Sequence, residues 1–383
     1  MIRTSLRRVV APGIAVTAIL AMTACGAGNE GDNGSDNDGG SNSGSTDGEA
    51  GASDVTVDGQ FTIGGASSQE AAQNAWTIGY TDVQPGATVT YEAIGSGGGR
   101  ENFISGAYPL AGSDAYLVDE APDNELSKAT ERCQGEAPIE VPNYVSPIAI
   151  AFNIEGVTEL KLTPETLAGI FAGQITNWSD PALAEDNPGL PDAAINAVHR
   201  SDESGTTENF TNYLSSVAGD VWTAGEVETW PGEAGGEGAA QTSGVIDAIT
   251  NGENSIGYAD ASQASELGKA SIEVNGEFID PTPEAAAAIL SASEPAAEAG
   301  ENQLVFDLNY TPDEAAYPIV LTSYLIACST YEDEAEANFV RTYMEYVLSA
   351  DGQQFGAEEA GVAPLAEDIE SQALEIVGKI SAG

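Results

Sequence analysis

The pattern that most constrains the fold of this chain is the alternation of short apolar strands with helical segments. Residues 61–63 and 88–93 are expected strands, and a stretch with helical character follows each of them. A longer apolar strand is expected at 147–153, and Pro164 after Thr163 is typical of a helix start. Such alternation predicts the α/β fold class.

The charge of the chain is strongly one-sided. Its 383 residues, enough for two lobes that each bury a core, include 61 acidic and 11 basic side chains, for a formal net charge of -50. A surface of this sign repels nucleic acid and anionic lipid headgroups, so no nucleic-acid partner is expected. One interpretation of the charge is solubility in a salty or acidic extracellular setting, but a composition shared across a lineage is favoured.

Residues 1–24 have the pattern of a lipoprotein signal peptide. Three arginines precede an apolar stretch at 9–22 that is too short for a durable membrane span. It ends in Met22-Thr23-Ala24-Cys25, which resembles a bacterial lipobox with methionine where leucine is usual. Cleavage there would leave Cys25 to carry a lipid anchor, the only expected membrane contact, at the extracellular face of the cytoplasmic membrane. A plain signal peptide with an incidental cysteine is the alternative.

Two further segments are expected to lack regular structure. Residues 25–54 begin with the lipidated cysteine and continue with glycine, serine, asparagine and aspartate, which favours a flexible acidic linker. Residues 223–244 are rich in glycine and glutamate and are expected to form an irregular loop. The folded part therefore begins near Val55.

Cys133 and Cys328 are the cysteines that remain after the leader. In an exported protein an even pair favours a disulfide, which in the chain-entropy model would contribute about 4 kcal/mol. Two buried free thiols are the alternative. Neither cysteine has metal-ligand spacing and His199 is the one histidine of the sequence, so no metal site and no cofactor are expected.

Three short segments share a design in which a strand ends, glycine and hydroxyl residues follow, and a helix begins. They are the first loop (64–68), the second loop (95–99) and the third loop (200–206). A helix N-terminus has unpaired N–H groups and partial positive charge, and glycine lets the backbone approach closely, so together they favour a tetrahedral anion. For each loop alone a serine cap without ligand is the alternative, and Ser67 with Glu70 also fits a capping box.

A resemblance to a known family rests on blocks spread over nearly all of residues 60–365. The blocks are Gly95-Ser96-Gly97-Gly98-Gly99, Ala111-Gly112-Ser113-Asp114-Ala115, Gly173-Gln174-Ile175-Thr176-Asn177-Trp178-Ser179-Asp180-Pro181, His199-Arg200-Ser201-Asp202-Glu203-Ser204-Gly205-Thr206, Trp230-Pro231, Ile256-Gly257-Tyr258 and Tyr317-Pro318-Ile319. In their order and spacing they resemble the phosphate-binding proteins of bacterial phosphate-specific ABC transporters. The resemblance implies a two-lobed type II periplasmic-binding-protein-like fold with the ligand between the lobes. Lobe one would comprise 55–146 plus 316–383, and lobe two 147–315.

The resemblance also implies a set of ligand-binding residues. They are Ser67, Ser68, Ser96, Asp114, Arg200, Ser204, Gly205 and Thr206. Ser68 departs from the family, which usually has an apolar or aromatic residue there, and is expected to contribute its backbone N–H. Asp202 is expected to orient Arg200 from within the same loop.

The role implied for Asp114 is to accept a hydrogen bond from the ligand's own proton. Phosphate keeps a proton at neutral pH, whereas sulfate has none and would place two acceptors in contact. Asp114 would therefore reject sulfate.

The resulting prediction is a non-enzymatic protein that captures inorganic phosphate, as a monomer, and delivers it to the permease subunits of an ABC importer. A binder of another oxyanion, such as sulfate or molybdate, is one alternative. A serine hydrolase using Ser204, Asp202 and His199 is the other. Those three residues lie in one short segment, whereas the groups of a triad normally converge from separate loops.

Overall fold

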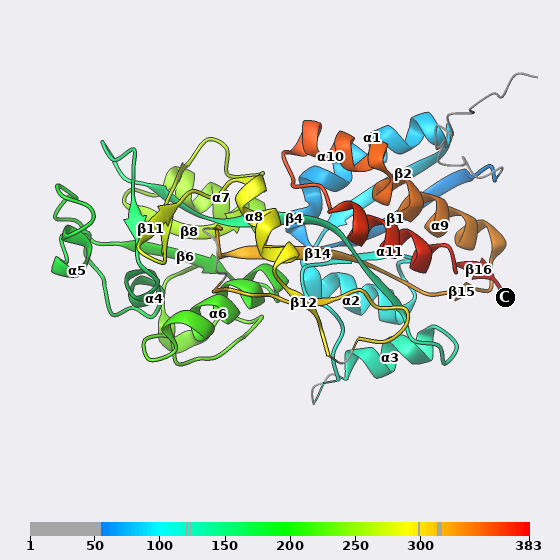
Figure 1. Ribbon diagram of the computed structural model, residues 1–383, viewed down its shortest axis with the longest axis horizontal. Coiled ribbons are helices and arrows are strands. Elements are labelled where there is room, and N and C mark those ends of the chain that lie inside the picture. Colours follow the sequence, from blue (N-terminus) through cyan, green and yellow to red (C-terminus); the bar gives the residue numbers. More distant parts are fainter. Residues whose placement is uncertain (1–54, 120–121, 123, 298, 312–315) are drawn as a thin grey trace, which may run out of the picture. The chain divides into compact units, whose positions relative to one another are not determined.

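The computed structural model describes residues 55–119, 122, 124–297, 299–311 and 316–383 (Figure 1). The described residues all belong to one unit, Ala50–Gly383. The expected signal peptide at 1–24, the lipidated Cys25 and the linker to residue 54 lie outside them.

The main sheet of the described residues has nine strands. Their order is β2 (Gly86–Ala93), β1 (Asp58–Gly65), β3 (Ala111–Ser113), β14 (Val320–Ala327), β4 (Ile139–Asn153), β8 (Ser255–Asp260), β6 (Asn196–Arg200) and β7 (Glu237–Ala239), with β9 (Gly268–Lys269) paired to β4. β1 runs parallel to β2 and β3, and β6 runs parallel to β7 and β8. β14 and β4 are antiparallel to their neighbours in the middle of the sheet.

The sheet has a β1 half (β2, β1, β3 and β14) and a β8 half (β8, β6, β7 and β9), and strand β4 belongs to both. Up to Pro147 it pairs with β14, and from Ile148 onward it pairs with β8 (Figure 1). The sequence predicts a strand at 147–153, but the strand already begins at Ile139, and 14 of its 15 residues are buried. The earlier half was missed because polar residues such as Asn143 interrupt its apolar pattern.

Six of the described helices pack on the β1 half of the sheet and cover its core. They are α1 (Glu70–Val83), α2 (Ser96–Ser105), α3 (Glu125–Arg132), α9 (Glu334–Leu348), α10 (Ala350–Ala360) and α11 (Glu367–Val377). Helix α1 packs on α9 and α10 through buried aromatic side chains, where the rings of Tyr80 and Tyr343 meet edge to face at 5.1 Å. Trp76, also in α1, donates from Nε1 to the carbonyl of Gly352 at 2.8 Å. Such aromatic burial is a large part of what holds the helices to the sheet.

The β8 half contains its own helices and a small second sheet. The helices are α4 (Pro164–Phe171), α5 (Pro181–Ala184), α6 (Gly205–Ala218), α7 (Gln241–Asn251) and α8 (Pro283–Ser291), and the second sheet has the order β11 (Glu277–Ile279), β10 (Ser271–Val274), β5 (Lys161–Leu162). The predicted helix start is confirmed, because Thr163 caps α4 and accepts from the N–H of Thr166.

The expected loop at 223–244 is only partly irregular. β7 adds to the edge of the sheet beside β6, and α7 already begins at Gln241. Gly235 and Gly236 both have positive φ, at 66° and 98°, and turn the chain into this short strand. Three residues of strand beside two glycines are too short a pattern for sequence reasoning to detect.

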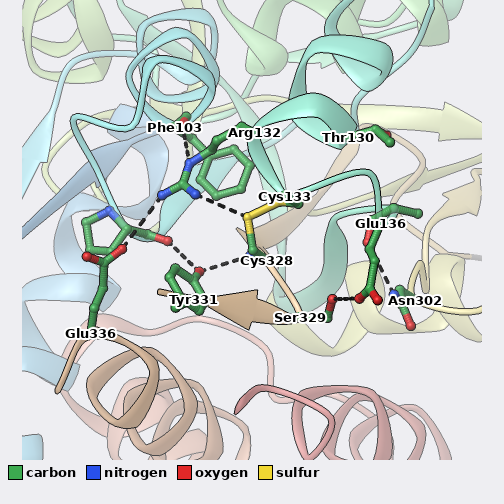
Figure 2. Close-up of a disulfide and its surroundings, with 12 residues drawn as sticks. Phe103, Thr130, Arg132, Cys133, Glu136, Asn302, Cys328, Ser329, Tyr331 and Glu336 are labelled. Atoms are coloured by element: carbon green, nitrogen blue, oxygen red, sulfur yellow. Dashed lines mark hydrogen bonds and ion pairs between the residues drawn. A yellow bond between two sulfur atoms is a disulfide. The ribbon is translucent and has the colours of Figure 1, made fainter. Parts of the chain in front are cut away.

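A disulfide joins Cys133 to Cys328 across a sequence separation of 195 residues, as the sequence analysis favours (Figure 2). Cys133 follows α3 and Cys328 follows β14, so the bond ties a peripheral helix to the middle of the sheet. Arg132 lies beside it, donating from Nη1 to Cys328 Sγ at 3.3 Å and from Nε to the carbonyl of Phe103 at 2.8 Å.

The segment around β12 (Glu294–Pro295) and β13 (Phe306–Asp307) contacts the β1 half of the molecule. The backbone N–H of Leu304 donates to the carbonyl of Glu140, and the N–H of Phe306 donates to Tyr324 OH. Over the described part of the chain, every helix falls short of the length and apolar character that crossing a bilayer requires.

Candidate functional site

The first and second loops start from neighbouring strands. β1 and β2 are parallel with Gly65 opposite Ala93, so the carboxyl ends of both strands lie at the same edge of the sheet. The chain passes from β1 into a 3-10 turn (Ser67–Gln69) and then α1, and from β2 through Gly95 into α2. Two helix N-termini therefore face the same region, as the sequence predicts.

The third loop meets the second at Gly95. A Cβ added there would lie 2.7 Å from Asp202 Oδ2 and 3.6 Å from Arg200 Nη2, so a side chain has no room. The φ of Gly95 is +95°, which also requires glycine. The glycine lets the guanidinium of Arg200 come close to the N-terminus of α2.

Helix α6 provides the third N-terminus. Ser204 is its N-cap, and its Oγ accepts from the N–H of Thr207 at 3.2 Å. A Cβ on Gly205 would lie 2.7 Å from the backbone N of Ala115. Glycine at this position therefore lets the first turn of α6 pack directly on the backbone of Asp114 and Ala115.

Asp114 follows β3, and protein hydroxyl groups surround its carboxylate. Oδ2 accepts from Ser68 Oγ at 2.6 Å and from Thr206 Oγ1 at 2.8 Å, and Oδ1 accepts from Ser323 Oγ at 2.6 Å. Burial raises the pKa of Asp114 above its ordinary value, while these hydrogen bonds and the charge of Arg200 act in the opposite direction. Ser96 Oγ accepts from the backbone N–H of Asp114 at 3.2 Å.

Asp202 holds the guanidinium of Arg200. Nε donates to Asp202 Oδ1 at 2.8 Å and Nη2 makes an ion pair with Oδ2. Asp202 also accepts from the backbone N–H of Gln241, which begins α7. Burial raises the pKa of Asp202, but the hydrogen bonds and charge of Arg200 outweigh that effect and keep it below its ordinary value. The carboxylate is therefore ionised and positions the arginine.

Ser67 contacts α7 rather than capping α1. Its Oγ accepts from the backbone N–H of Thr242 at 3.0 Å, and Gln263 Nε2 donates to its carbonyl at 2.8 Å. The N-cap of α1 is Gln69, without a side-chain cap bond, so the capping box of Ser67 with Glu70 is not formed.

The structure brings all eight expected ligand residues together and removes them from solvent. Ser67, Ser68, Ser96, Asp114, Arg200, Ser204 and Thr206 are each at most 3% exposed, and Gly205 is buried as well. Three of the partners that hold them, Thr242, Gln263 and Ser323, were missed because they lie far away in the sequence and in no recognisable motif. The role of the Ser68 side chain was also missed. Its hydroxyl donates to Asp114, whereas only its backbone N–H was expected to contribute.

The chemistry of this group is that of an anion site with one acceptor. Three helix N-termini, hydroxyl groups and a guanidinium donate, while Asp114 can accept from an oxyanion that carries a proton. Two groups of the hydrolase alternative have other partners. Ser204 Oγ caps helix α6. His199 Nδ1 donates to the carbonyl of Arg200 at 2.8 Å, and the His199 ring stacks on Trp230. Among the described residues there is no cluster of His, Cys, Asp or Glu arranged to hold a metal ion.

Comparison with known proteins defines the class. Residues 50–351 match the family described as "PBP superfamily domain". The fold also matches a solved periplasmic phosphate-binding protein, PfluDING, with a TM-score of 0.66 at 23% identity, covering 82% of this chain and 92% of the other. The fold is therefore the two-lobed type II periplasmic-binding-protein fold that was predicted.

Relatives in sequence narrow the class further. The chain is 33% identical over 372 residues to phosphate-binding protein PstS2 of Mycobacterium bovis, covering 94% of this chain and 95% of the relative. It is 31% identical over 380 residues to phosphate-binding protein PstS 3 of Mycobacterium tuberculosis, covering 97% and 98%. The chain belongs to this PstS family of the PBP superfamily. Like these relatives, it is a binding protein and not an enzyme.

Proposed function

We propose that the protein captures inorganic phosphate between two lobes and delivers it to the permease subunits of an ABC importer. The observation that carries the proposal is the convergence of Arg200, Asp114 and three helix N-termini in one buried group. The relatives named as phosphate-binding proteins support it.

The proposed lobes are 55–146 with 316–383, and 147–315. The first and second loops and Asp114 come from the first set, and the third loop comes from the second set. A ligand held by all three loops would therefore link the lobes and be hidden from water when they close. The burial of the expected ligand residues supports a closed form.

Selectivity is proposed to come from Asp114. Its carboxylate would accept a hydrogen bond from the proton that phosphate carries, whereas sulfate would face it with a second acceptor at a cost of several kcal/mol. Arg200 and the helix N-termini would hold the remaining oxygens of either ion. The alternative ligands sulfate and molybdate thus differ from phosphate in their contact with one residue.

The mature protein is proposed to be a monomer, anchored through lipid on Cys25 at the extracellular face of the cytoplasmic membrane. The lipobox-like end of residues 1–24 supports this location. Mass spectrometry of the mature N-terminus would detect the lipid, and Cys25→Ala is expected to release the protein from membranes. Retention of that variant would contradict the anchor.

The function is tested by calorimetric titration of full-length protein with phosphate, sulfate and molybdate. Phosphate is expected to bind with the highest affinity. Asp114→Asn is expected to weaken phosphate binding by about tenfold or more and to admit sulfate, because the amide can donate where the carboxylate cannot. Unchanged discrimination in this variant would contradict the role of Asp114, and tighter binding of sulfate by the wild type would contradict the function.

A further inference from the structure

A chain of buried hydrogen bonds runs from helix α9 to the carboxylate of Asp114. Tyr343 OH donates to Gln73 Oε1, and Gln73 Nε2 donates to Gln69 Oε1, both at 2.7 Å. Gln69 Nε2 then donates to Ser323 Oγ at 2.8 Å, and Ser323 Oγ donates to Asp114 Oδ1 at 2.6 Å. The four side chains that precede Asp114 are each 0% exposed, so water does not compete for these bonds.

The direction of the chain is determined at Gln69. Its Nε2 group also donates to the backbone carbonyl of Tyr324 at 3.0 Å, and a carbonyl can only accept. Its Oε1 faces the other way and accepts from Asn143 Nδ2 at 3.2 Å. Because Gln69 donates to the oxygen of Ser323, the hydroxyl proton of Ser323 is left to point at Asp114.

Both oxygens of Asp114 therefore accept hydrogen bonds from protein hydroxyl groups. Ser323 donates to Oδ1, and Ser68 and Thr206 donate to Oδ2. Gln69 holds the orientation of the Ser323 hydroxyl, because its Nε2 donates to the Ser323 oxygen. A proton on Oδ1 would meet a hydroxyl that is already committed as a donor, so the arrangement opposes protonation at Oδ1.

We propose that Gln69 and Ser323 are specificity-determining residues: they hold Asp114 as an acceptor, so the proton shared between Asp114 and a bound oxyanion has to come from the ligand. The inference rests on the proposed function, in which phosphate supplies that proton. It assigns the exclusion of sulfate partly to two positioning residues that lie behind Asp114 and outside the set of ligand residues.

Other ionisable groups also face Asp114 and bear on the test. They are Arg200 of β6, Asp260 of β8, Tyr91 of β2 and Tyr144 of β4. Burial raises the pKa of Asp260 to about 6, so its titration adds to any pH curve. Burial also raises the pKa of Asp114, and the hydrogen bond from Ser323 is first among the effects that lower it. Variants are therefore compared with the wild type at each pH.

The experiment measures the ratio of the sulfate Kd to the phosphate Kd for full-length protein at about pH 5.5, 6.5 and 8. In Ser323→Ala the ratio is expected to fall by about tenfold, most at the lowest pH, where the less supported carboxyl of Asp114 takes up a proton and donates to sulfate. Gln69→Met keeps the side-chain length but releases the Ser323 hydroxyl, and is expected to lower the ratio by about threefold.

Thr322→Val is the matched control. Thr322 precedes Ser323 in the same strand, is 1% exposed, and points to the opposite face of the sheet. In Thr322→Val the ratio of the sulfate Kd to the phosphate Kd is expected to stay within about twofold of the wild-type value. Wild-type ratios at every pH in Ser323→Ala would overturn the inference, and the same result in Gln69→Met would overturn it if the alanine variant does not fold. A wild-type protein without preference for phosphate would instead overturn the proposed function.

Discussion

Two arginines in this protein are buried equally and have opposite electrostatic surroundings. Arg100 in α2 and Arg200 at the end of β6 are each 2% exposed. Arg200 has one carboxylate partner, Asp202, and lies beside Gly95, the N-cap of α2. Its positive charge is paired with Asp202 and also lowers the pKa of Asp114, and the helix N-terminus adds positive potential around it.

Arg100 is instead surrounded by an excess of carboxylates. It forms ion pairs with Glu125 at 2.7 Å, Glu228 at 2.6 Å and Glu203 at 3.7 Å. An adjoining cavity of about 570 Å³ is lined by Arg100 together with Glu125, Glu203, Glu208, Glu226 and Glu228. Burial would lower the pKa of Arg100, but Glu228 and Glu125 raise it well above its ordinary value.

Under the proposed function, the local balance of charge, rather than burial alone, distinguishes the arginine of the anion site from Arg100. Carboxylates around Arg100 take up its donors and repel an oxyanion, so its role is to hold α2 and α3 to the third-loop region. Arg200 has an ion pair with one carboxylate only, and Asp114 is the other buried acid that its charge acts on. Changes at Arg100, Arg200 and Glu203 separate a structural arginine from a ligand-binding one.

Removing Arg100 is expected to have the largest effect, and the effect is on stability. Arg100→Ala leaves Glu125 and Glu228 without their cation, and breaking such buried pairs typically costs about 3–5 kcal/mol in the free energy of unfolding. Phosphate affinity is expected to change by less than about fivefold. Urea denaturation and calorimetry measure the two quantities, and a loss of affinity without a loss of stability would reverse the proposed roles.

Removing Arg200 is expected to affect binding most. Arg200→Ala deletes the guanidinium donors, and the phosphate Kd is expected to rise by about 100-fold, because each hydrogen bond to a charged group contributes about 1.5–3 kcal/mol. The free energy of unfolding should fall less than in Arg100→Ala, since only Asp202 loses its partner. A Kd within tenfold of the wild type would place the anion elsewhere.

The smallest expected effect is a pH dependence from the glutamates around Arg100. Burial, followed by the nearby Glu228, raises the pKa of Glu203 to about 7, well above its value in an unfolded chain. The folded protein therefore holds an extra proton, and this contribution to stability is complete below about pH 4.5 and is lost as the pH rises through 7. It should be about 1 kcal/mol or less, because the Glu203 side chain is 54% exposed.

Thermal unfolding of the wild type and of Glu203→Gln between about pH 5 and 8 measures this contribution. The variant is expected to lose less stability than the wild type over that range. Glu140, which is buried elsewhere and has its pKa raised to about 7, keeps its own pH dependence in both proteins. Equal slopes in the two proteins would contradict the assignment to Glu203.

Local patterns in the sequence were sufficient to predict the loops of the site. Pro164 after Thr163 marked a helix start, and the serine and glycine residues of 200–206 marked another, because capping chemistry acts within a few residues. The parallel strands β1 and β2 bring the first and second loops to the same edge of the sheet, whereas the approach of the third loop, which follows β6 in the other half of the sheet, was implied by the family resemblance.

Contacts between residues distant in sequence could not be predicted. Ser323 lies 209 positions from Asp114, and Thr242 lies 175 positions from Ser67, in a stretch that was expected to be an irregular loop. Serine and threonine are common in strands and helix starts, so neither has a local signature of its role. The glutamates around Arg100 were equally hidden, because 61 acidic residues offer no contrast in the sequence.

Strand β4 has a consequence for how the two halves of the sheet can move. Its residues before Pro147 are locked in register with β14, and those from Ile148 are locked with β8. Opening of the proposed lobes would therefore not slide the strand along either neighbour, and the change of angle would have to be absorbed in a few bonds near Pro147 and at residues 316–319, directly before β14. Amide hydrogens within β4 should accordingly exchange slowly with and without ligand, while those of the three loops exchange slowly only when the ligand holds them closed.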